Sequence, residues 1–407
     1  MTRRVVITGM GGLSPIGNCW QTIRGALQAG TSGVCFYPDW DQVEGLQTRL
    51  GAPADFERPP HFDRKKIRTM GRVALLAARA TELALADAGL LQQAADLDCG
   101  IAYGSTSGAP PSIQKYAEQI TVNKTLAGVS VSDYIKFMSH TTAANLTQFF
   151  GFKGRVVPAC SACSSGSQAI GFAYENIKYG QQNVMIAGGA EELHVLSATV
   201  FDIMYATSTR NHEPSSTPRP FDADRDGLVV GEGAATFVLE SLEHAQARDA
   251  PIHGEILGFG TNCDGAHIVT PSVKGMRGAM TLALKDAGLG PAQIGFVNAH
   301  GTATEVGDIA ESQATAQVFD RPVPISSLKS YMGHTLGACG ALEAWISVAM
   351  MKEGWLAPTL NLETVDPRCA PLDYLTAVRD SAPDRIMTNN FAFGGVNTSL
   401  ILGKWTG

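Results

Sequence analysis

Short runs of β-branched and apolar residues alternate with longer alanine-rich stretches along the whole chain. In the first part, this alternation predicts strands at 5–8, 99–103 and 184–187, and helices at 71–89 and from Cys163 to about Gly180. After about residue 250 it predicts strands at 255–259 and 294–298, and helices at 276–287 and 337–351. Alternation of this kind is typical of α/β proteins with mostly parallel sheets covered by helices.

The chain also shows signs of a duplicated architecture. Each half begins with a predicted strand and a glycine-rich turn, ITGMGG in the first half and ILGFGTNCDG in the second. With 407 residues, the chain exceeds the usual size of one small core. We therefore expect two tightly packed halves, residues 1–250 and 251–407, with surface loops at the proline-rich stretches 53–60 and 214–220.

Charge and hydropathy exclude several classes of protein. The formal net charge of −7 argues against a nucleic-acid-binding protein, which must neutralise phosphates. No stretch approaches the roughly 20 apolar residues of a membrane-spanning helix, and the apolar run after MTRR is too short for a signal peptide. The eight cysteines are scattered, as expected for small buried residues in a reducing compartment. A cytoplasmic protein is the expectation.

Cys163 is the first candidate for chemistry. It lies in ACSACSSGS, just before a predicted helix whose positive N-terminal end would favour the reactive thiolate. The alternative is a small buried cysteine without a chemical role. Cys160 and Cys163 form a C-x-x-C pair, but a zinc site usually needs a second pair, which the sequence lacks, so we expect no metal site.

Two glycine-flanked histidines are the next candidates. His300 follows the predicted strand 294–298, at the end where parallel α/β folds place their active sites. His334 lies in KSYMGHTLGACGALEA, between Lys329 and Glu343. The alternatives are a hydrogen-bonded histidine at a strand end and a structural Lys–Glu ion pair.

Phe393 precedes two glycines in NNFAFGGVNTS. These glycines would let a backbone N–H reach an oxyanion, with the phenyl ring as a gate; the alternative is a hairpin turn with Phe391 and Phe393 in the core. Together, the cysteine, the two histidines and this loop could supply a nucleophile, hydrogen-bond donors and an oxyanion hole for acyl transfer.

At this point the sequence resembles the β-ketoacyl-acyl-carrier-protein synthases of classes I and II. The motifs ACSSG, RPFDADRDGLVVGEGA, NAHGTAT-x-x-GD, KSYMGHTLGACGALEA and FAFGG follow one another in the order of that family. The resemblance implies a thiolase-like fold with α-β-α-β-α layers. It also implies that Cys163 is the nucleophile and that His300 and His334 complete a Cys-His-His set.

The mechanism implied by the resemblance is a ping-pong Claisen condensation. An acyl chain passes from acyl carrier protein to Cys163, and malonyl carrier protein then loses carbon dioxide and extends the chain by two carbons. The phosphopantetheine arm arrives on the carrier, and no tightly bound cofactor is expected. The family assigns further roles to a supporting ion pair, Lys329 and Glu343; to arm contacts, Thr302 and Thr304; and to an oxyanion donor and gate, Phe393.

The resemblance also suggests where the chain and the carrier bind. Ser107 lies where the family sets chain length, and Phe201 and Phe391 belong to other pocket segments. Carrier protein is acidic, so Lys65 and Arg68 of the DRKKIR run, together with Lys136, are docking candidates, with plain solvent exposure as the alternative. We expect a dimer, either with a second copy or with a paralogous chain-length factor.

Some positions depart from the family pattern. Ser161 replaces a usual threonine, YMGH replaces MTGH, NNFAFGG replaces NSFGFGG, and Tyr205 stands where smaller residues are usual. These departures favour a specialised acyl substrate, such as a polyene-type chain, over housekeeping fatty-acid synthesis.

Three other functions fit the sequence less well. A non-catalytic chain-length partner would typically lack Cys163. A thiolase would need a second cysteine near the C-terminus, and Cys369 is poorly placed. A dinucleotide site would need more than the G-x-G-G of residues 9–12.

Overall fold

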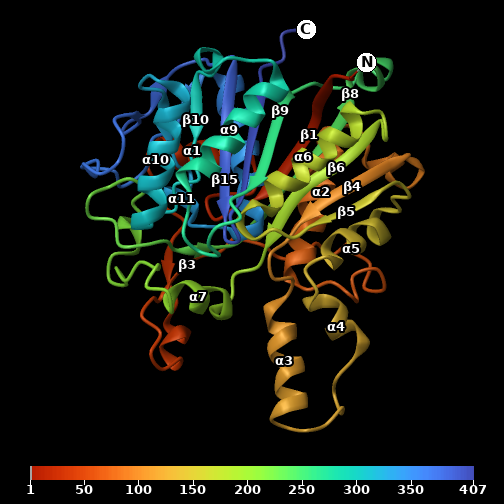
Figure 1. Cartoon of the computed structure of the whole chain (residues 1–407). Helices are drawn as coiled ribbons and strands as arrows, with labels where there is room; N and C mark the ends of the chain where they lie inside the picture. Colours follow the sequence, from red (N-terminus) through yellow and green to blue (C-terminus); the bar gives the residue numbers. More distant parts are fainter. Residues whose placement is uncertain (1) are drawn as a thin grey trace.

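The computed structural model describes residues 2–407, and its centre is one mixed sheet of eleven strands (Figure 1). The strands run in the order β13-β11-β10-β15-β16-β9-β1-β8-β6-β4-β5. Those of the first half are β1 (Val5–Leu13), β4 (Cys99–Gly104), β5 (Val156–Ala159), β6 (Val184–Glu191) and β8 (Gly233–Ser241). Those of the second half are β9 (Gly254–Cys263), β10 (Phe296–Asn298), β11 (Pro324–Ser326), β13 (Asp373–Tyr374), β15 (Arg385–Ala392) and β16 (Val396–Gly403).

The two halves of the sheet repeat one topology. In each half, the outer pairs are parallel (β5-β4-β6 in the first and β13-β11-β10-β15 in the second), and the next two pairs are antiparallel (β6-β8-β1 and β15-β16-β9). The halves join where Val5–Ile7 pairs with Gly254–Ile256. The expectation of mostly parallel sheets therefore holds only for the outer strands. The short turn between β15 and β16 can form only an antiparallel hairpin, because a parallel return needs a long crossover.

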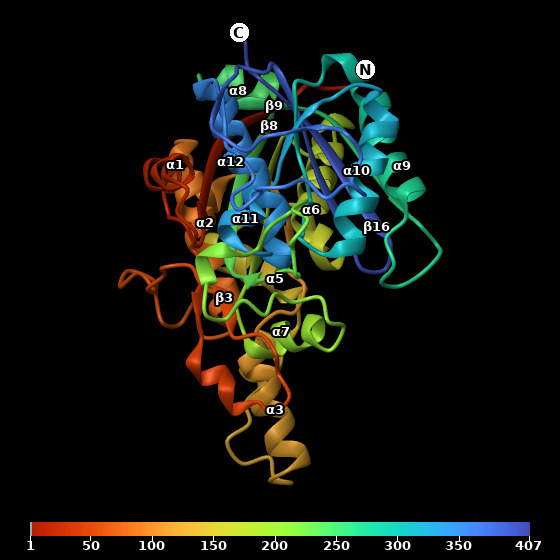
Figure 2. The same ribbon diagram turned by 90° about the vertical axis from the view of Figure 1, so that its left-hand side faces the viewer.

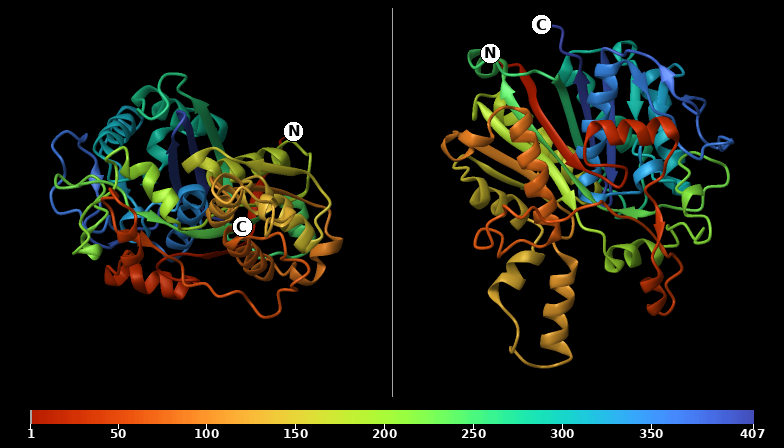
Figure 3. Two further views of the ribbon diagram at one scale, coloured as in Figure 1. Left: turned by 90° about the horizontal axis from the view of Figure 1, so that it is seen from below. Right: turned by 180° about the vertical axis from the view of Figure 1, so that it is seen from behind.

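Each half of the sheet forms one β layer, and helices pack on the outer face of each half and between the two halves, which gives an α-β-α-β-α arrangement. Figures 1 and 3 show helices on both sides of the strands. The layers are defined by which helix packs on which strands. The outer helices are α2 (Arg72–Asp87) and α5 (Thr141–Phe150) on the first half, and α9 (Val273–Ala287) and α10 (Glu305–Phe319) on the second. The central layer contains α6 (Ser165–Lys178) and α12 (Cys339–Glu353). Residues Cys339–Met351 of α12 are all buried, as expected for a helix enclosed by protein on every side.

Shorter elements surround this core. Figure 2 shows α3 (Pro110–Thr121) projecting from the body of the molecule, and α4 (Val131–Phe137) packs against it. The other helices are α1 (Trp20–Ala29), α7 (Val195–Asp202), α8 (Leu242–Ala247) and α11 (Lys329–Met332). The small strands are β2 (Cys35–Phe36), β3 (Leu50–Ala52), β7 (Val230–Gly231), β12 (Trp355–Leu356) and β14 (Arg379–Asp380).

The glycine-rich turns predicted after the first strand of each half are wrong. Gly9, Gly11 and Gly12 lie inside β1, which continues to Leu13. Gly258 and Gly260 lie inside β9, which continues to Cys263, and only Gly265 follows its strand. A Cβ atom on Gly9 would lie 2.2 Å from the Ala84 carbonyl of α2, and one on Gly258 would lie 2.5 Å from the Ala283 carbonyl of α9. The glycines therefore let a helix approach the strand closely, in the same way in both halves.

The other predicted elements are present with small changes at their ends. For example, α6 ends at Lys178, and Gly180 then adopts the left-handed conformation (φ 74°) expected of a glycine after a helix. Within residues 2–407, no helix is both long and apolar enough to cross a bilayer. We infer that the division between the halves lies at about residue 250, between α8 and β9.

Candidate active site

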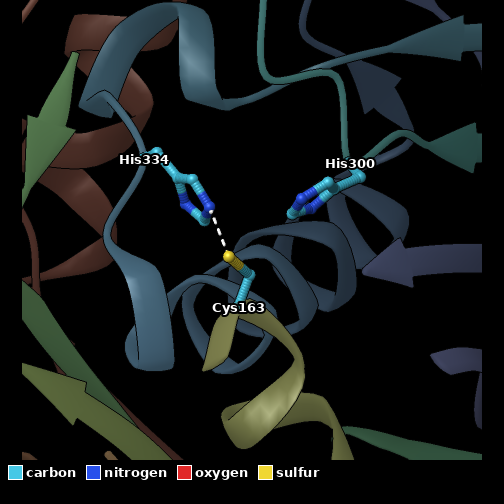
Figure 4. Close-up of side chains that lie close together, drawn as sticks. All are labelled: Cys163, His300 and His334. Carbon is cyan, nitrogen blue, oxygen red and sulfur yellow. Dashed lines mark hydrogen bonds between the residues drawn. The ribbon is translucent and has the colours of Figure 1, made fainter. Parts of the chain in front are cut away.

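A cavity of about 320 Å³ lies between the two halves and brings together residues from distant parts of the sequence. Cys163, His300 and His334 all line it, and their side chains point toward one another (Figure 4). Of the remaining predicted residues, the cavity is lined by Thr302, Thr304, Phe201, Phe391 and Phe393. Apolar side chains, including those of Met204, Ile268 and Val306, form part of the wall.

A strained turn positions Cys163. The residue lies in a single 3₁₀ turn, Ala162–Ser164, between β5 and α6. Ala162 has φ 48°, in the left-handed region that residues with a Cβ atom rarely adopt. Such strain is commonly found at functional sites, where the surrounding packing supports it. Here it places the thiol at the base of the cavity, 6% exposed.

The pKa of Cys163 differs from the sequence-based expectation. Burial raises the pKa of this thiol to about 12, although Lys329 and the backbone N–H groups of Cys163 and Phe393 act to lower it. Desolvation of the charged form therefore outweighs the helix terminus. The thiol is protonated at neutral pH, and the two N–H groups that face the sulfur are positioned to bind an oxyanion.

This raised pKa predicts how the thiol reacts with iodoacetamide. Only the thiolate is alkylated, and its fraction grows about tenfold per pH unit below the pKa. The alkylation rate of Cys163 should therefore rise steadily from pH 7 to pH 9. Peptide mass spectrometry after timed quenching measures this rate separately from that of the exposed Cys160. A plateau below pH 8 would contradict the prediction.

His334 presents a hydrogen-bond donor to the cavity. Its Nε2 lies 2.9 Å from Cys163 Sγ, and its Nδ1 accepts a hydrogen bond from the Leu336 N–H at 3.2 Å. Because Nδ1 is an acceptor, the proton of the neutral ring must lie on Nε2. Burial, with the Lys329 ammonium, holds the pKa of His334 well below its usual range, so the ring is neutral.

His300 is arranged in the same way. Its Nδ1 lies 3.2 Å from Lys329 Nζ and 3.5 Å from Asn390 Nδ2, and both of these groups are donors. Burial first, and then Lys329 and His334, keep the pKa of His300 well below its usual range. The Nε2 atom therefore carries the proton. The two imidazole rings lie 5.2 Å apart and are nearly perpendicular, at 88°.

A buried ion pair supports His300. Lys329 Nζ donates to Glu343 Oε1 at 2.5 Å, and Asn390 Nδ2 donates to Glu343 Oε2 at 2.8 Å. Lys329 and Glu343 are 1% and 0% exposed. Burial acts to lower the pKa of Lys329, but nearby ionisable groups, Glu343 among them, leave it raised, so the ammonium persists. The ion pair expected from the sequence is thus present, and its ammonium donates to the acceptor nitrogen Nδ1 of His300.

Breaking this pair should destabilise the protein. Lys329→Met would leave the Glu343 carboxylate buried without its partner, at a cost of about 3–5 kcal/mol in the free energy of unfolding. Urea unfolding at pH 7 measures this loss. The double variant Lys329→Met/Glu343→Gln should recover most of it, because no unpaired charge remains. Equal losses in the single and the double variant would contradict the account.

Two further acidic residues, which the sequence did not single out, hold the loop after His300. Glu311 accepts hydrogen bonds from the N–H groups of His300 (2.8 Å) and Gly301 (2.7 Å), and burial raises its pKa to about 8. Asp308 accepts a hydrogen bond from the Ala303 N–H at 3.1 Å. Asp308 is the last residue of NAHGTAT-x-x-GD, so the sequence motif included it. Its role depends on tertiary contacts and could not be predicted from the motif.

Besides Lys329 and Glu343, four predicted residues lie outside the cavity. The Ser107 N–H donates to the buried side chain of Glu191, whose other oxygen accepts a hydrogen bond from the Gly337 N–H. Lys65 and Arg68 are exposed, and Lys136 is partly buried in α4. Their roles in chain length and carrier docking remain predictions.

The donor set does not suit a metal ion. Cys163, His300 and His334 place one ligand atom each within 4.8 Å of one another. However, the Nε2 atom of each histidine carries a proton because its Nδ1 is an acceptor, and a protonated nitrogen cannot ligate. The Lys329 ammonium, 3.2 Å from His300 Nδ1, also disfavours a second cation. Cys160 is exposed and contacts Ser139 Oγ at 3.1 Å, and both it and Cys163 are free thiols.

Comparisons with known proteins show which family the chain belongs to. The family model "Beta-ketoacyl synthase, N-terminal domain" matches residues 2–245, and "Beta-ketoacyl synthase, C-terminal domain" matches residues 253–363. The 3-oxoacyl-[acyl-carrier-protein] synthase 1 of Escherichia coli is 36% identical, and synthase 2 of Vibrio cholerae is 37% identical, each with 99% of both chains covered.

Solved structures give the same result. A β-ketoacyl synthase from Burkholderia phymatum is 57% identical, with a TM-score of 0.97 over 99% of this chain and 100% of its own. The ishigamide ketosynthase/chain length factor is 32% identical, with a TM-score of 0.92 over 100% of both chains. These matches extend over essentially the whole sequence and include both halves of the site. The chain belongs to the β-ketoacyl synthase family.

Proposed function

We propose that this protein is a β-ketoacyl-acyl-carrier-protein synthase that joins a Cys163-bound acyl chain to a malonyl unit. One observation carries the assignment of roles. Two neutral histidines, His300 and His334, present Nε2–H donors to the same cavity as the Cys163 thiol. A general base would need an unprotonated nitrogen. Paired donors instead suit an enolate oxygen, which gains negative charge during decarboxylation.

The first half-reaction is acyl transfer. Cys163 attacks the thioester carbon of the acyl carrier protein, and the backbone N–H groups of Cys163 and Phe393 stabilise the oxyanion. The tetrahedral intermediate collapses to an acyl-Cys163 thioester and a free carrier thiol, which takes up the proton of the cysteine. Cys163 is only 6% exposed, so these two donors act at the sulfur with little competition from water.

The second half-reaction uses the histidines. Malonyl carrier protein places its thioester oxygen against the Nε2–H groups of His300 and His334, and loss of carbon dioxide converts this thioester to an enolate. The enolate carbon attacks the acyl-Cys163 carbonyl, and the Cys163 sulfur leaves and regains a proton. The product is a β-ketoacyl chain, two carbons longer, on the carrier.

The same proposal covers the substrate arm and cofactors. Thr302 and Thr304 line the cavity, and their hydroxyl groups lie 2.9 Å apart, so they suit the polar amides of a phosphopantetheine arm. That arm arrives with the carrier, and no tightly bound cofactor takes part. Phe201 and Phe393 pack together in the wall of the cavity, with ring centroids 5.5 Å apart, and Phe393 is the proposed gate. Phe391 packs against His300, with ring centroids 6.1 Å apart.

Acyl carrier protein is the proposed macromolecular partner, with Lys65, Arg68 and Lys136 as docking residues. One structural relative, 29% identical with a TM-score of 0.89, is a type II ketosynthase in complex with its acyl-carrier protein. Another is a ketosynthase/chain length factor pair. The ketosynthase/chain length factor supports a dimer with a paralogous chain, and a dimer with a second copy of this chain is the other form that we propose. The cytoplasm is the proposed compartment, and a specialised acyl chain remains the proposed substrate.

Condensation assays with purified protein test this function. Acyl carrier proteins of graded chain length and malonyl carrier protein are supplied, with and without a paralogous partner where the source genome encodes one. Products two carbons longer from the protein alone support an active homodimer. Products that require the partner support the heterodimer, and no product in either case supports the chain-length role.

A further inference from the structure

A segment of the first half lies beneath the loop that carries His300. This segment, residues 219–227 of the RPFDADRDG motif, precedes β8 in the sequence. The Phe221 ring lies so close to Gly301 that a Cβ atom on this glycine would be 3.3 Å from it. Phe221 is fully buried and packs against Tyr374 of the second half, with ring centroids 5.1 Å apart. Although the motif belongs to the first half of the sequence, Phe221 packs against residues of the second half.

Arg225 is the most connected residue of this segment. Its side chain is 1% exposed and forms an ion pair with Asp366 at 2.7 Å and with Asp308 at 3.5 Å. It also donates to the backbone carbonyls of Thr304 (3.4 Å) and Glu305 (3.0 Å). A guanidinium can make all these contacts at once because its five N–H donors form a rigid planar fork.

Asp308 connects this guanidinium to two strained backbone positions. Its carboxylate accepts hydrogen bonds from the N–H groups of Phe221 (2.7 Å) and Ala303 (3.1 Å). Phe221 has φ 66° and Ala303 has φ 67°, both in the left-handed region. Each such residue costs on the order of 1–3 kcal/mol and persists only where its surroundings hold it in place. The buried Asp308 carboxylate, which is paired with Arg225, therefore binds both strained positions.

The loop 300–305 is therefore held along its length by buried acidic and basic side chains. Glu311 binds the N–H groups of residues 300 and 301, Asp308 binds the N–H of residue 303, and Arg225 binds the carbonyls of residues 304 and 305. Glu311 and Asp308 belong to α10, the helix that the loop enters. Arg225 comes from the half that carries Cys163.

We propose that Arg225 is a positioning residue that fixes the loop 300–305, with His300 and the arm-binding threonines, relative to the half that carries Cys163. The inference rests on the proposed function, because it concerns the geometry of the condensation. Arg225 does not line the cavity, so it acts through the backbone and not on the substrate. A displacement of about 1 Å between reacting groups typically costs about 100-fold in rate.

Arg225→Gln, Arg225→Lys and a matched control, Arg219→Gln, test this role. Arg219 belongs to the same segment, is 8% exposed, and forms ion pairs with Asp222 and Glu363, but its contacts do not include residues 300–305. Three quantities are measured for each variant: condensation on pre-acylated enzyme, iodoacetamide alkylation of Cys163, and the thermal midpoint. Alkylation by a small reagent requires neither His300 nor the phosphopantetheine arm, so its rate shows whether the half that carries Cys163 is intact.

We expect Arg225→Gln to condense about 10- to 100-fold more slowly, with alkylation within about twofold of wild type. Arg225→Lys keeps the charge but not the fork, so its loss should be intermediate. Arg219→Gln should lower the thermal midpoint while condensing like wild type.

Wild-type condensation rates in both Arg225 variants would overturn the role of Arg225. So would losses of condensation and alkylation in parallel in the Arg225 and Arg219 variants. If Arg225→Gln does not fold, the same comparison is made with Arg225→Lys. A wild-type protein that never condenses would instead contradict the proposed function.

Discussion

His300→Ala and His334→Ala should each lower the rate of malonyl decarboxylation about 100- to 1000-fold, as expected when one preorganised donor to a developing oxyanion is removed. Both rings are neutral and turn their Nε2–H groups into the cavity, because their Nδ1 atoms are occupied as acceptors. Carbon dioxide release from malonyl carrier protein measures this step directly. Formation of acyl-Cys163 should fall much less in the His300 variant, since His334, not His300, contacts the sulfur at 2.9 Å.

The His→Gln variants sharpen this prediction. A glutamine amide also donates a hydrogen bond, so His300→Gln should retain more decarboxylation than His300→Ala. A donor role also predicts no loss of decarboxylation when the pH falls from 8 to 6.5, because both histidines stay neutral across that range. A rate that followed the titration of a histidine would point to a general base instead.

Cys163→Ala should abolish condensation, with a loss on the order of 10⁴-fold or more, because a nucleophile that forms the covalent intermediate has no substitute. The fold should remain, since the substitution removes one buried sulfur and adds no charge. Single-turnover formation of the β-ketoacyl product measures the effect.

Cys339→Ala is the matched control for the nucleophile. This second buried thiol lies close by, and its Sγ is 3.2 Å from the Cys163 carbonyl oxygen. Burial raises its pKa well above the usual range, and the cavity is not lined by it. Cys339→Ala should therefore keep most of the activity. A large loss in this variant with activity retained in Cys163→Ala would move the nucleophile to Cys339.

Much of the site could be predicted from local sequence. The spacing of strands and helices placed Cys163 before a helix and His300 after a strand, and the structure has both features. Motif resemblance brought His334, Lys329 and Glu343 to the same site, and their side chains lie together in the structure.

Other features depend on tertiary contacts that local sequence does not encode. Burial decides the pKa of Cys163, whereas the sequence alone shows the expected helix terminus and not the burial. In the sequence Gly9 resembles a turn residue, but in the structure it lies inside β1 with α2 packed closely against it. Arg225 reaches a loop about 80 residues away in sequence, so its partners could not be found from spacing alone.

Intact-mass spectrometry of the wild type and Cys163→Ala tests the central claim most directly. Each protein is incubated with a panel of acyl carrier-protein thioesters, and malonyl carrier protein is then added. The account predicts an acyl adduct on the wild type alone, mapped to the peptide containing Cys163, followed by release of a chain two carbons longer. An adduct of equal size on Cys163→Ala, or a wild type that stays unmodified with every acyl chain and partner supplied, would contradict it.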